Sequence, residues 1–245
     1  MIVSKSKAFS FLTMLIIGLS LLLSCKDKDL PQAVGPTAPL YIINATGDTI
    51  DFFVNGTRQN NTTPIYPGGA IGYLPITIGA QSYSYKKDGN PDVLFTFPYV
   101  LNAGSYYSTF VGGESANETF IHADALDSAT TILQADSPAY ANCMVRFVHA
   151  SADTATLKVT ISSLNSKGVD SINTSFENCA FKYVGLFKEV IGGSKTIMVY
   201  TSGSNTPRID TTLILTAGGI YTLFTKGGLK GKGSAAYALN LMTNN

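Results

Sequence analysis

The sequence predicts an all-β protein built from two β-sandwiches in tandem, and three observations carry this prediction. Hydrophobic residues make up 45% of the chain and charged residues only 13%, which favours a packed core over disorder. Apolar and polar residues alternate in short segments between glycine-containing turns. One set of motifs occurs twice. Because no segment after residue 40 shows a sustained helical period, we expect strands throughout.

The first 24 residues have the pattern of a secretory signal peptide. Lys5 and Lys7 precede an apolar run from Ala8 to Leu23. This run is shorter than the ~20 apolar residues of a membrane-spanning helix, and charged residues follow it at once. We therefore expect the segment to be cleaved.

Cys25 follows the apolar run directly. Leu22, Leu23, Ser24 and Cys25 resemble the bacterial lipobox. The resemblance implies that Cys25 becomes the first residue of the mature protein and carries a membrane anchor of more than one acyl chain, which suffices for stable anchoring. The alternative is an ordinary signal peptide with a chance cysteine.

The segment after Cys25 predicts a tether on the outside of a membrane. Residues 26–29 resemble the charged export patch of surface lipoproteins in Bacteroidota-type Gram-negative bacteria, and a solvated spacer is the alternative. Residues 30–39 contain three prolines and one glycine, which favours an extended chain. We expect a signal peptide at 1–24, a lipidated N-terminus and flexible tether at 25–39, and an outer-membrane lipoprotein that faces the cell surface rather than the periplasm.

The remaining chain repeats itself. Four residues of the first copy align with residues 105 positions later: Asn44, Ala45, Asp48 and Thr49 with His149, Ala150, Asp153 and Thr154. Four more recur 114 residues later: Ala103, Gly104, Tyr107 and Phe110 as Ala217, Gly218, Tyr221 and Phe224. We place β-sandwich domain 1 at 40–136 and domain 2 at 141–245, because Pro138 lies in a break of the pattern between them. We expect each copy to have its own hydrophobic core and to fold alone.

Alternation inside the copies predicts which residues face the core. Ile50, Phe52 and Val54 share one face of a strand, and Tyr83 and Tyr85 alternate with serines in another. The segments 54–56, 66–69, 86–90 and 102–104 contain the glycines that tight turns need. Short strands at this spacing favour sandwiches.

Both copies resemble the bacterial domain of unknown function 4397. The resemblance rests on these segments: "NATGDTIDFFVNG" at 44–56, "NAGSYYS" at 102–108, "VRFVHASAD" at 145–153 and "AGGIYT" at 217–222. It covers most of residues 40–243 and implies an immunoglobulin-like β-sandwich without an established activity. Gly47 and Ala152 replace the usual proline, and "LKVTISS" replaces "VDVYVNG", so the turn after that strand stays open.

Cys143 and Cys179 are the thiols that remain once Cys25 is lipidated. An oxidising compartment permits a disulfide between them. Two buried free cysteines are the alternative that we favour, because the sequence does not supply the required Cα distance.

No constellation in the sequence predicts catalysis, a metal or another cofactor. His122 and His149 fall in different copies, and His149 corresponds to Asn44, so a turn hydrogen bond is the simpler role. Asp48, Asp51 and Asp153 fit turn capping better than calcium, which needs six to eight oxygens. The segment "GGLKGKGS" at 227–234 lacks the spacing of a phosphate loop and is expected to be a flexible hairpin loop.

Two surface features are candidates for recognition or modification. A candidate aromatic surface for sugar rings consists of Tyr73, Tyr83, Tyr85 and Tyr106, although outward tyrosines are common on sandwiches. Five Asp-Ser or Asp-Thr pairs resemble the O-glycosylation signal of Bacteroidota-type envelope proteins, with turn chemistry as the alternative. The acceptors would be Thr49, Ser128, Thr154, Ser171 and Thr211.

These observations predict a lipid-anchored, non-catalytic binding or scaffolding module of the cell envelope. A glycan or an envelope protein is the expected partner. Nucleic acid is not, because the net charge is +1 and the basic residues are scattered. A structural or adhesion subunit is the second interpretation, and an enzyme is the third.

Overall fold

The computed structural model describes residues 35–61, 63–135, 141–164 and 170–244. The signal peptide, Cys25, most of the tether and most of the predicted boundary at 136–142 lie outside the described residues. Both sequence copies fall within one compact unit, Ala33–Asn245. Among the residues described, no helix has the length and apolar character that crossing a membrane requires.

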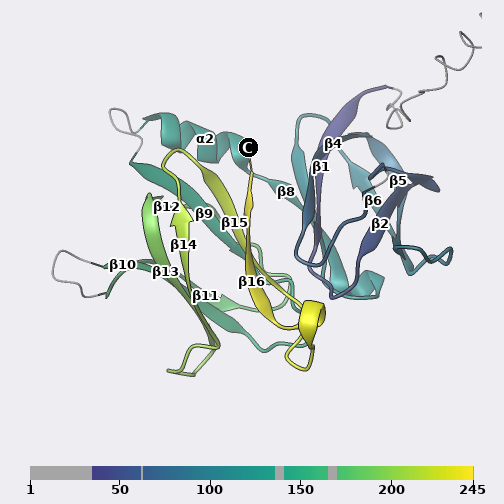
Figure 1. Ribbon diagram of the computed structural model, residues 1–245. Coiled ribbons are helices and arrows are strands. Elements are labelled where there is room, and N and C mark those ends of the chain that lie inside the picture. Colours follow the sequence, from purple (N-terminus) through teal and green to yellow (C-terminus); the bar gives the residue numbers. More distant parts are fainter. Residues whose placement is uncertain (1–34, 62, 136–140, 165–169, 245) are drawn as a thin grey trace, which may run out of the picture. The chain divides into compact units, whose positions relative to one another are not determined.

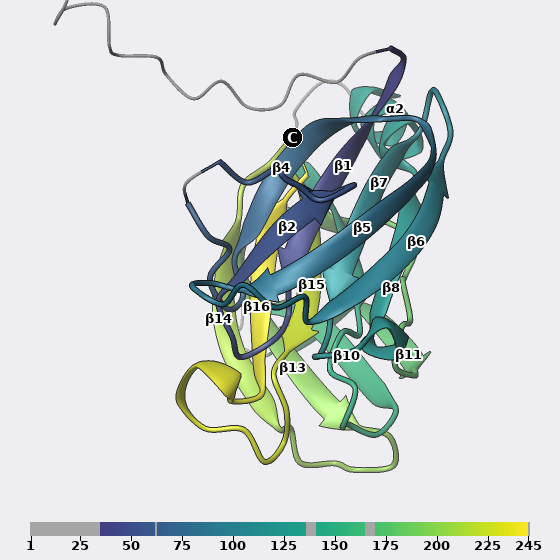
Figure 2. The same ribbon diagram turned by 90° about the vertical axis from the view of Figure 1, so that its right-hand side faces the viewer.

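The first half of the described chain is a sandwich of two four-stranded sheets. Sheet A has the order β4-β1-β7-β8 and sheet B the order β3-β2-β5-β6; Figure 2 shows β2, β5 and β6 as the front layer. The strands are β1 (Thr37–Asn44), β2 (Ile50–Val54), β3 (Thr57–Arg58), β4 (Ala70–Thr77), β5 (Gly79–Lys87), β6 (Phe95–Leu101), β7 (Tyr106–Val111) and β8 (Thr119–Asp124), and a short 3-10 helix η2 (Ala116–Glu118) precedes β8.

The second half repeats this topology with every strand number raised by eight. Sheet C has the order β12-β9-β15-β16 and sheet D the order β11-β10-β13-β14 (Figure 1). The strands are β9 (Asn142–Val148), β10 (Leu157–Leu164), β11 (Asp170–Cys179), β12 (Lys188–Ile191), β13 (Gly193–Thr201), β14 (Ile209–Leu215), β15 (Ile220–Lys226) and β16 (Ala238–Thr243), and η3 (Gly233–Ala235) precedes β16. The parallel pair β1–β7 recurs as β9–β15. The predicted all-β fold of two sandwiches is confirmed.

Each half has a core between its own two sheets. In the first half, Ile50 and Phe52 lie in this core and Val54 packs against it, as the alternation predicts. The second core contains Val145 and Phe147 of β9 opposite Val159 of β10. The turn at 54–56 forms between β2 and β3, where Asn55 and Gly56 both have positive φ, the geometry of a two-residue hairpin turn. The corresponding turn after β10 lies outside the described residues.

The expectation of strands throughout is wrong at one place, because Leu126–Ala135 forms the helix α2. Leu126, Ala129 and Leu133 lie on one face of α2 and pack against Met144 and Ile220 of the second half. The spacing of these three residues is helical, but it spans only 10 residues and is too short to stand out as a period. Figure 1 shows α2 beside β9.

Candidate functional site

Sheets A and C pack against each other through their outer faces. A third cluster of buried apolar residues lies between them and draws on both halves: Ile43, Ala45, Phe110 and Phe120 from the first, Val148, Ala150, Phe224 and Met242 from the second. The rings of Phe110 and Phe224 meet edge to face with their centroids 6.3 Å apart. The two sandwiches therefore share a core in addition to their own.

This junction pairs matching residues of the two copies. Phe110 and Phe224 correspond to each other in the sequence repeat and are in contact, which is the signature of a two-fold, isologous interface. The backbones of the two halves also meet here: Gly227 donates its N–H to the carbonyl of Ala45 at 2.8 Å. A Cβ atom at Gly112 would lie 2.6 Å from the carbonyl oxygen of Ala150, the repeat partner of Ala45.

A buried ion pair crosses the junction. Arg146 of β9 is 1% exposed and lies with Nη1 2.6 Å from Oδ1 of Asp124 at the end of β8. Its Nε donates to Thr222 at 2.8 Å, and its guanidinium lies 4.7 Å from the centre of the Phe187 ring. Asp124 also accepts a hydrogen bond from Ser108 at 2.6 Å. Both charges are removed from water, so the loss of either side chain would leave the other as an uncompensated buried charge.

The polar cluster around this pair also has matching members from the two copies. Ser108 lies opposite Tyr41 in the sheet A ladder, and Thr222 lies opposite Arg146 in the sheet C ladder. Thr222 donates to Asn244 at 2.6 Å, much as Ser108 donates to Asp124. The two copies differ at one position of this cluster, because Arg146 occupies the place that Tyr41 has in the first copy. Arg146 supplies the positive charge that pairs with Asp124.

A pocket of about 510 Å³ opens at one end of the junction, and we call it the loop-end pocket. Matching loops of the two copies line it, residues 46–48 with 152–153 and residues 112–114 with 227–228, together with Gly231, Ser234 and Ala235. Six of the fourteen described residues that line it are glycines. Much of its wall therefore offers backbone groups.

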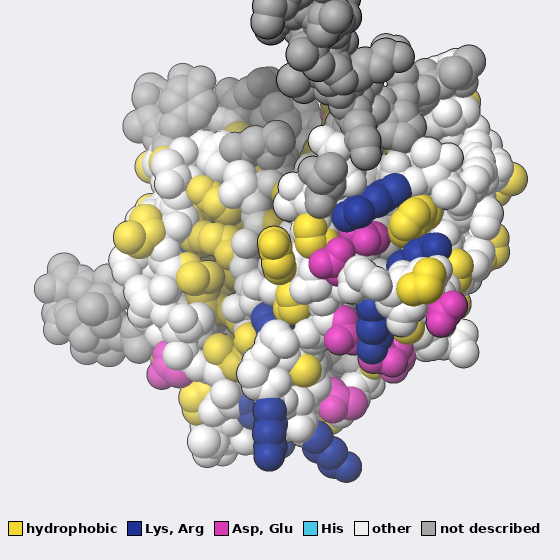
Figure 3. All heavy atoms as spheres, turned by 45° about the vertical axis from the view of Figure 1, so that its right-hand side comes forward, with side chains coloured by type: hydrophobic (Ala, Val, Ile, Leu, Met, Phe, Trp, Pro, Cys, Tyr) yellow, Lys and Arg dark blue, Asp and Glu magenta, His cyan; other side chains and the backbone are white. Residues whose placement is uncertain are grey.

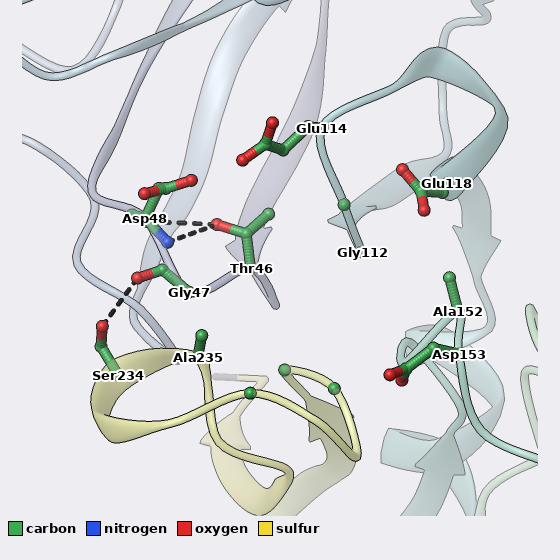
Figure 4. Close-up of a pocket in the computed structure, with 14 residues that line it drawn as sticks. Thr46, Gly47, Asp48, Gly112, Glu114, Glu118, Ala152, Asp153, Ser234 and Ala235 are labelled. Atoms are coloured by element: carbon green, nitrogen blue, oxygen red, sulfur yellow. Dashed lines mark hydrogen bonds between the residues drawn. The ribbon is translucent and has the colours of Figure 1, made fainter.

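Four carboxylates surround this pocket, those of Asp48, Glu114, Glu118 and Asp153 (Figure 4). Lys87 lies 2.8 Å from Glu114 and 2.9 Å from Asp48, and hydrogen bonds to these two groups raise the pKa of Lys87. Among the described residues, no three His, Cys, Asp or Glu side chains form a group that could hold a metal ion. The four carboxylates present hydrogen-bond acceptors to the pocket.

The other carboxylates are also held in place. Glu118 accepts from Ser115 at 2.8 Å, and Asp153 accepts from the backbone N–H of Leu229 at 2.9 Å. On the face drawn in Figure 3, basic side chains are interspersed with acidic ones.

A smaller pocket of about 280 Å³ also draws on both halves, and we call it the α2-end pocket. Tyr73 and Tyr106 line it from the first half, Ile220 and Asn244 from the second, and α2 adds Asp127 among others. The rings of Tyr73 and Tyr106 meet edge to face at 5.2 Å. The hydroxyl of Tyr73 donates to Asp124 at 3.2 Å, which connects this pocket to the buried ion pair.

The family pattern described as "Domain of unknown function (DUF4397)" matches residues 38–160. The chain belongs to the DUF4397 family. The match covers the first sandwich and continues through β9 into β10. Comparison with curated proteins gives no match.

Three solved structures resemble the DUF4397 chain weakly. Two come from work on streptococcal virulence factors, "Alpha-glucan recognition by family 41 carbohydrate-binding modules" (10% identity, 78% of this chain, 93% of that chain, TM-score 0.25) and "Alpha-glucan binding" (6%, 84%, 96%, 0.26). The third is a proposed cell adhesion protein from Bacteroides ovatus (11%, 86%, 97%, 0.20). At these TM-scores the resemblances carry no argument about the function of the DUF4397 chain.

The predicted aromatic surface is wrong for two of its four tyrosines. Tyr83 and Tyr85 are 2% and 1% exposed and belong to the core of the first half. The rings of both contact the ring of Phe52, because the alternation of β5 places the two tyrosines on the face toward the core. Tyr73 and Tyr106 remain, and they line the α2-end pocket.

His149 has the turn role that the sequence predicts. Its Nδ1 accepts the N–H of Ser151 at 3.3 Å, as Oδ1 of Asn44 accepts the N–H of Thr46 at 2.9 Å in the first half. His149 Nε2 lies 3.3 Å from the carbonyl of Ala155. The two side chains therefore close equivalent turns.

Burial of His149 predicts a loss of stability in acid. Desolvation lowers its pKa to about 4, opposed by the hydrogen bond to Ala155. The folded pKa lies below the usual 6.5, so the unfolded chain binds more protons between these values, and stability is lost as pH falls from about 6.5 to 4. The loss amounts to about 3 kcal/mol.

The matched variant is His149→Asn, because the first copy carries Asn44 at this place. Urea denaturation from pH 7 to 4 should show a flatter pH dependence in His149→Asn than in the wild type. His122→Gln is the comparison variant: burial also lowers the pKa of His122, so this variant measures how much of the wild-type pH dependence comes from the second histidine. An unchanged slope in His149→Asn would refute the assignment.

Cys143 and Cys179 are both buried and free, so the structure contains no bridge between them. Both lie in the core of the second half. Burial raises the pKa of Cys143 to about 11 and that of Cys179 to about 12. Both thiols are therefore protonated and unreactive at neutral pH.

The five candidate glycosylation acceptors differ in their surroundings. Ser128 lies exposed on α2. Thr49, Thr154 and Thr211 are all half-buried. The hydroxyl of Thr154 also forms a hydrogen bond with His149 at 2.9 Å. Ser171 lies in β11, and its side chain is outside the description.

The three aspartates considered for turn capping have partners from other segments of the chain. Asp48 pairs with Lys87 and Asp153 with the backbone of Leu229, while buried Asp51 pairs with Arg58. The segment 227–234 is the predicted hairpin loop between β15 and β16, and it also walls the loop-end pocket.

Proposed function

We propose that the chain is a lipid-anchored protein of the cell envelope that acts as a non-catalytic binding module, with the loop-end pocket as its ligand site. The observation that supports binding is that equivalent loops of both halves line this pocket. A site made by two halves with a shared core is held rigid, and this lowers the cost of ordering a ligand.

The proposal extends the family to both halves. Sheets C and D repeat the strand order of sheets A and B, and the sequence "VRFVHASAD" carries the family motif at 145–153. We therefore treat residues 141–245 as a second DUF4397 copy after a first copy at 40–136.

Anchoring through Cys25 is tested by fractionation. We expect Cys25→Ala to move the protein from the membrane fraction to the soluble fraction, because the lipid would then be missing. Cys143→Ala is the control and should stay in the membrane. Persistence of Cys25→Ala in the membrane would remove the lipoprotein assignment, and protease digestion of intact cells compared with lysed cells reports which side the protein faces.

The loop-end pocket supplies its own reporters for a binding test. The backbone amides of Gly112, Gly113, Gly227 and Gly228 give signals in a sparsely populated region of the amide NMR spectrum. We would titrate the labelled, lipid-free chain with solubilised envelope polysaccharide and with lysine-rich peptides, both of which offer donors to carboxylates. We expect shifts that concentrate on these glycines.

Two carboxylate variants make this test specific. Glu114→Gln should weaken the interaction at least fivefold, because it removes a charged acceptor from the pocket. Glu177→Gln alters an exposed carboxylate paired with Lys158 elsewhere and should leave the affinity unchanged. The site would be rejected if neither class of probe shifts the glycines, or if the two variants behave alike.

A further inference from the structure

The α2-end pocket combines an aromatic wall with a polar floor. Tyr106 is 38% exposed, and its ring contacts the partly buried ring of Tyr73. Leu126 and Ile220 complete the apolar wall. An aromatic ring with an open face can pack against the C–H face of a sugar ring.

The floor is a buried amide. Asn244 is 3% exposed, and its Oδ1 accepts from Thr222 at 2.6 Å. Its Nδ2 lies 3.4 Å from the hydroxyl of Tyr73, which accounts for one of the two amide hydrogens. The described residues provide no partner for the second hydrogen. The floor can therefore donate to a ligand hydroxyl.

The rim adds polar groups from one face of α2. Asp127 and Thr130 are both exposed and three residues apart, so they lie on the same side of the helix. A carboxylate accepts from two adjacent hydroxyls at once, and a threonine hydroxyl both donates and accepts.

The charge of the pocket selects against anions. No Lys or Arg is among the described residues that line it, and the nearby Arg146 is already paired with Asp124. The volume of about 280 Å³ lies just below the range of ~300–1,000 Å³ for drug-sized ligands. A single ring of a neutral molecule rich in hydroxyl groups fits the volume of the pocket, its aromatic wall, its amide floor and its lack of basic side chains.

We infer that the α2-end pocket binds one neutral pyranose residue of an oligosaccharide, stacked on Tyr106 and hydrogen-bonded by Asp127, Thr130 and Asn244. The site is separate from the loop-end pocket and does not depend on the function proposed for it. It also assigns a role to the part of the tyrosine cluster that is not buried.

The test is an NMR titration of the full mature chain, made lipid-free by Cys25→Ala. The probes are maltohexaose, cellohexaose and mannohexaose as neutral oligosaccharides, and hexagalacturonate as an anionic one. We expect at least one neutral probe to shift the amides of Thr130, Ile220 and Asn244, and to bind more tightly than hexagalacturonate. Shifts that appear only at the glycines of the loop-end pocket would overturn this inference while supporting the other site.

Variants at Tyr106 complete the test. Tyr106→Ala should raise the Kd of the bound neutral probe at least tenfold, whereas Tyr106→Phe keeps the ring and should change it less than threefold. Tyr66→Ala removes a tyrosine that is 62% exposed and outside the pocket, and it should have no effect. The inference fails if no neutral probe binds at millimolar concentration, if hexagalacturonate binds best, or if Tyr106→Ala leaves the Kd unchanged.

Discussion

Replacement of Asp124 by Asn is expected to lower the free energy of unfolding by about 3–5 kcal/mol. The variant keeps the size of the side chain and an acceptor for Ser108, but it leaves Arg146 buried at 1% exposure without its counter-charge. Urea denaturation of the lipid-free chain at pH 7 measures the effect.

The matched control is the exposed ion pair between Lys158 and Glu177, whose atoms lie 3.1 Å apart. Glu177→Gln should cost less than about 1 kcal/mol, because water screens this pair. The double variant Asp124→Asn with Arg146→Met should recover part of the loss, since no unpaired charge then remains. Equal costs for Asp124→Asn and Glu177→Gln would contradict a buried pair across the junction.

Truncation of either central phenylalanine is expected to be equally severe. Phe110 and Phe224 are 0% and 1% exposed, and replacement of a buried Phe by Ala costs about 3–5 kcal/mol. Because their rings are in contact, the two effects should not add. A double-mutant cycle should give a coupling energy of about 0.5–1.5 kcal/mol.

This coupling reports contact between the copies and not merely the burial of each ring. Pairing Phe224→Ala with Tyr66→Ala supplies the control, because Tyr66 lies exposed in the first half and the two changes should add. A coupling of zero between Phe110 and Phe224 would mean that the two halves do not share a core in solution.

The fold could be predicted from the sequence because its signals are local. Alternation placed Ile50 and Phe52 in the core, and the Asn55–Gly56 turn formed where glycine allowed it. The repeat predicted two equivalent sandwiches, and the topology repeats strand for strand. The helix α2 was missed because its apolar face is defined by tertiary contacts over a few turns.

The junction was not predicted, although the sequence contains a signal for it. Six consecutive residues of β9, from Cys143 to Val148, are buried, and β15 is similar. A strand that is buried on both faces loses its alternation, so the run "CMVRFV", apolar except for Arg146, indicates a second packing surface. Asp124 and Arg146 could not be paired in advance, because their contact depends on how two sheets meet.

The pockets lay beyond sequence reasoning for the same reason. Asp48 and Asp153 are visible as repeat partners, but only the packing of the halves places them around one cavity. Tyr73 and Tyr106 were among the tyrosines singled out, yet nothing local separates them from Tyr83 and Tyr85, which face the core.

The central claim is that the two copies form one cooperative unit, and calorimetry of the lipid-free chain tests it most directly. The sequence expectation was that each copy folds alone, whereas the shared core and the buried ion pair predict a joint transition. We expect a single peak whose van't Hoff and calorimetric enthalpies agree, shifted as a whole by Phe224→Ala. Two separate transitions, with only one moved by Phe224→Ala, would contradict the account.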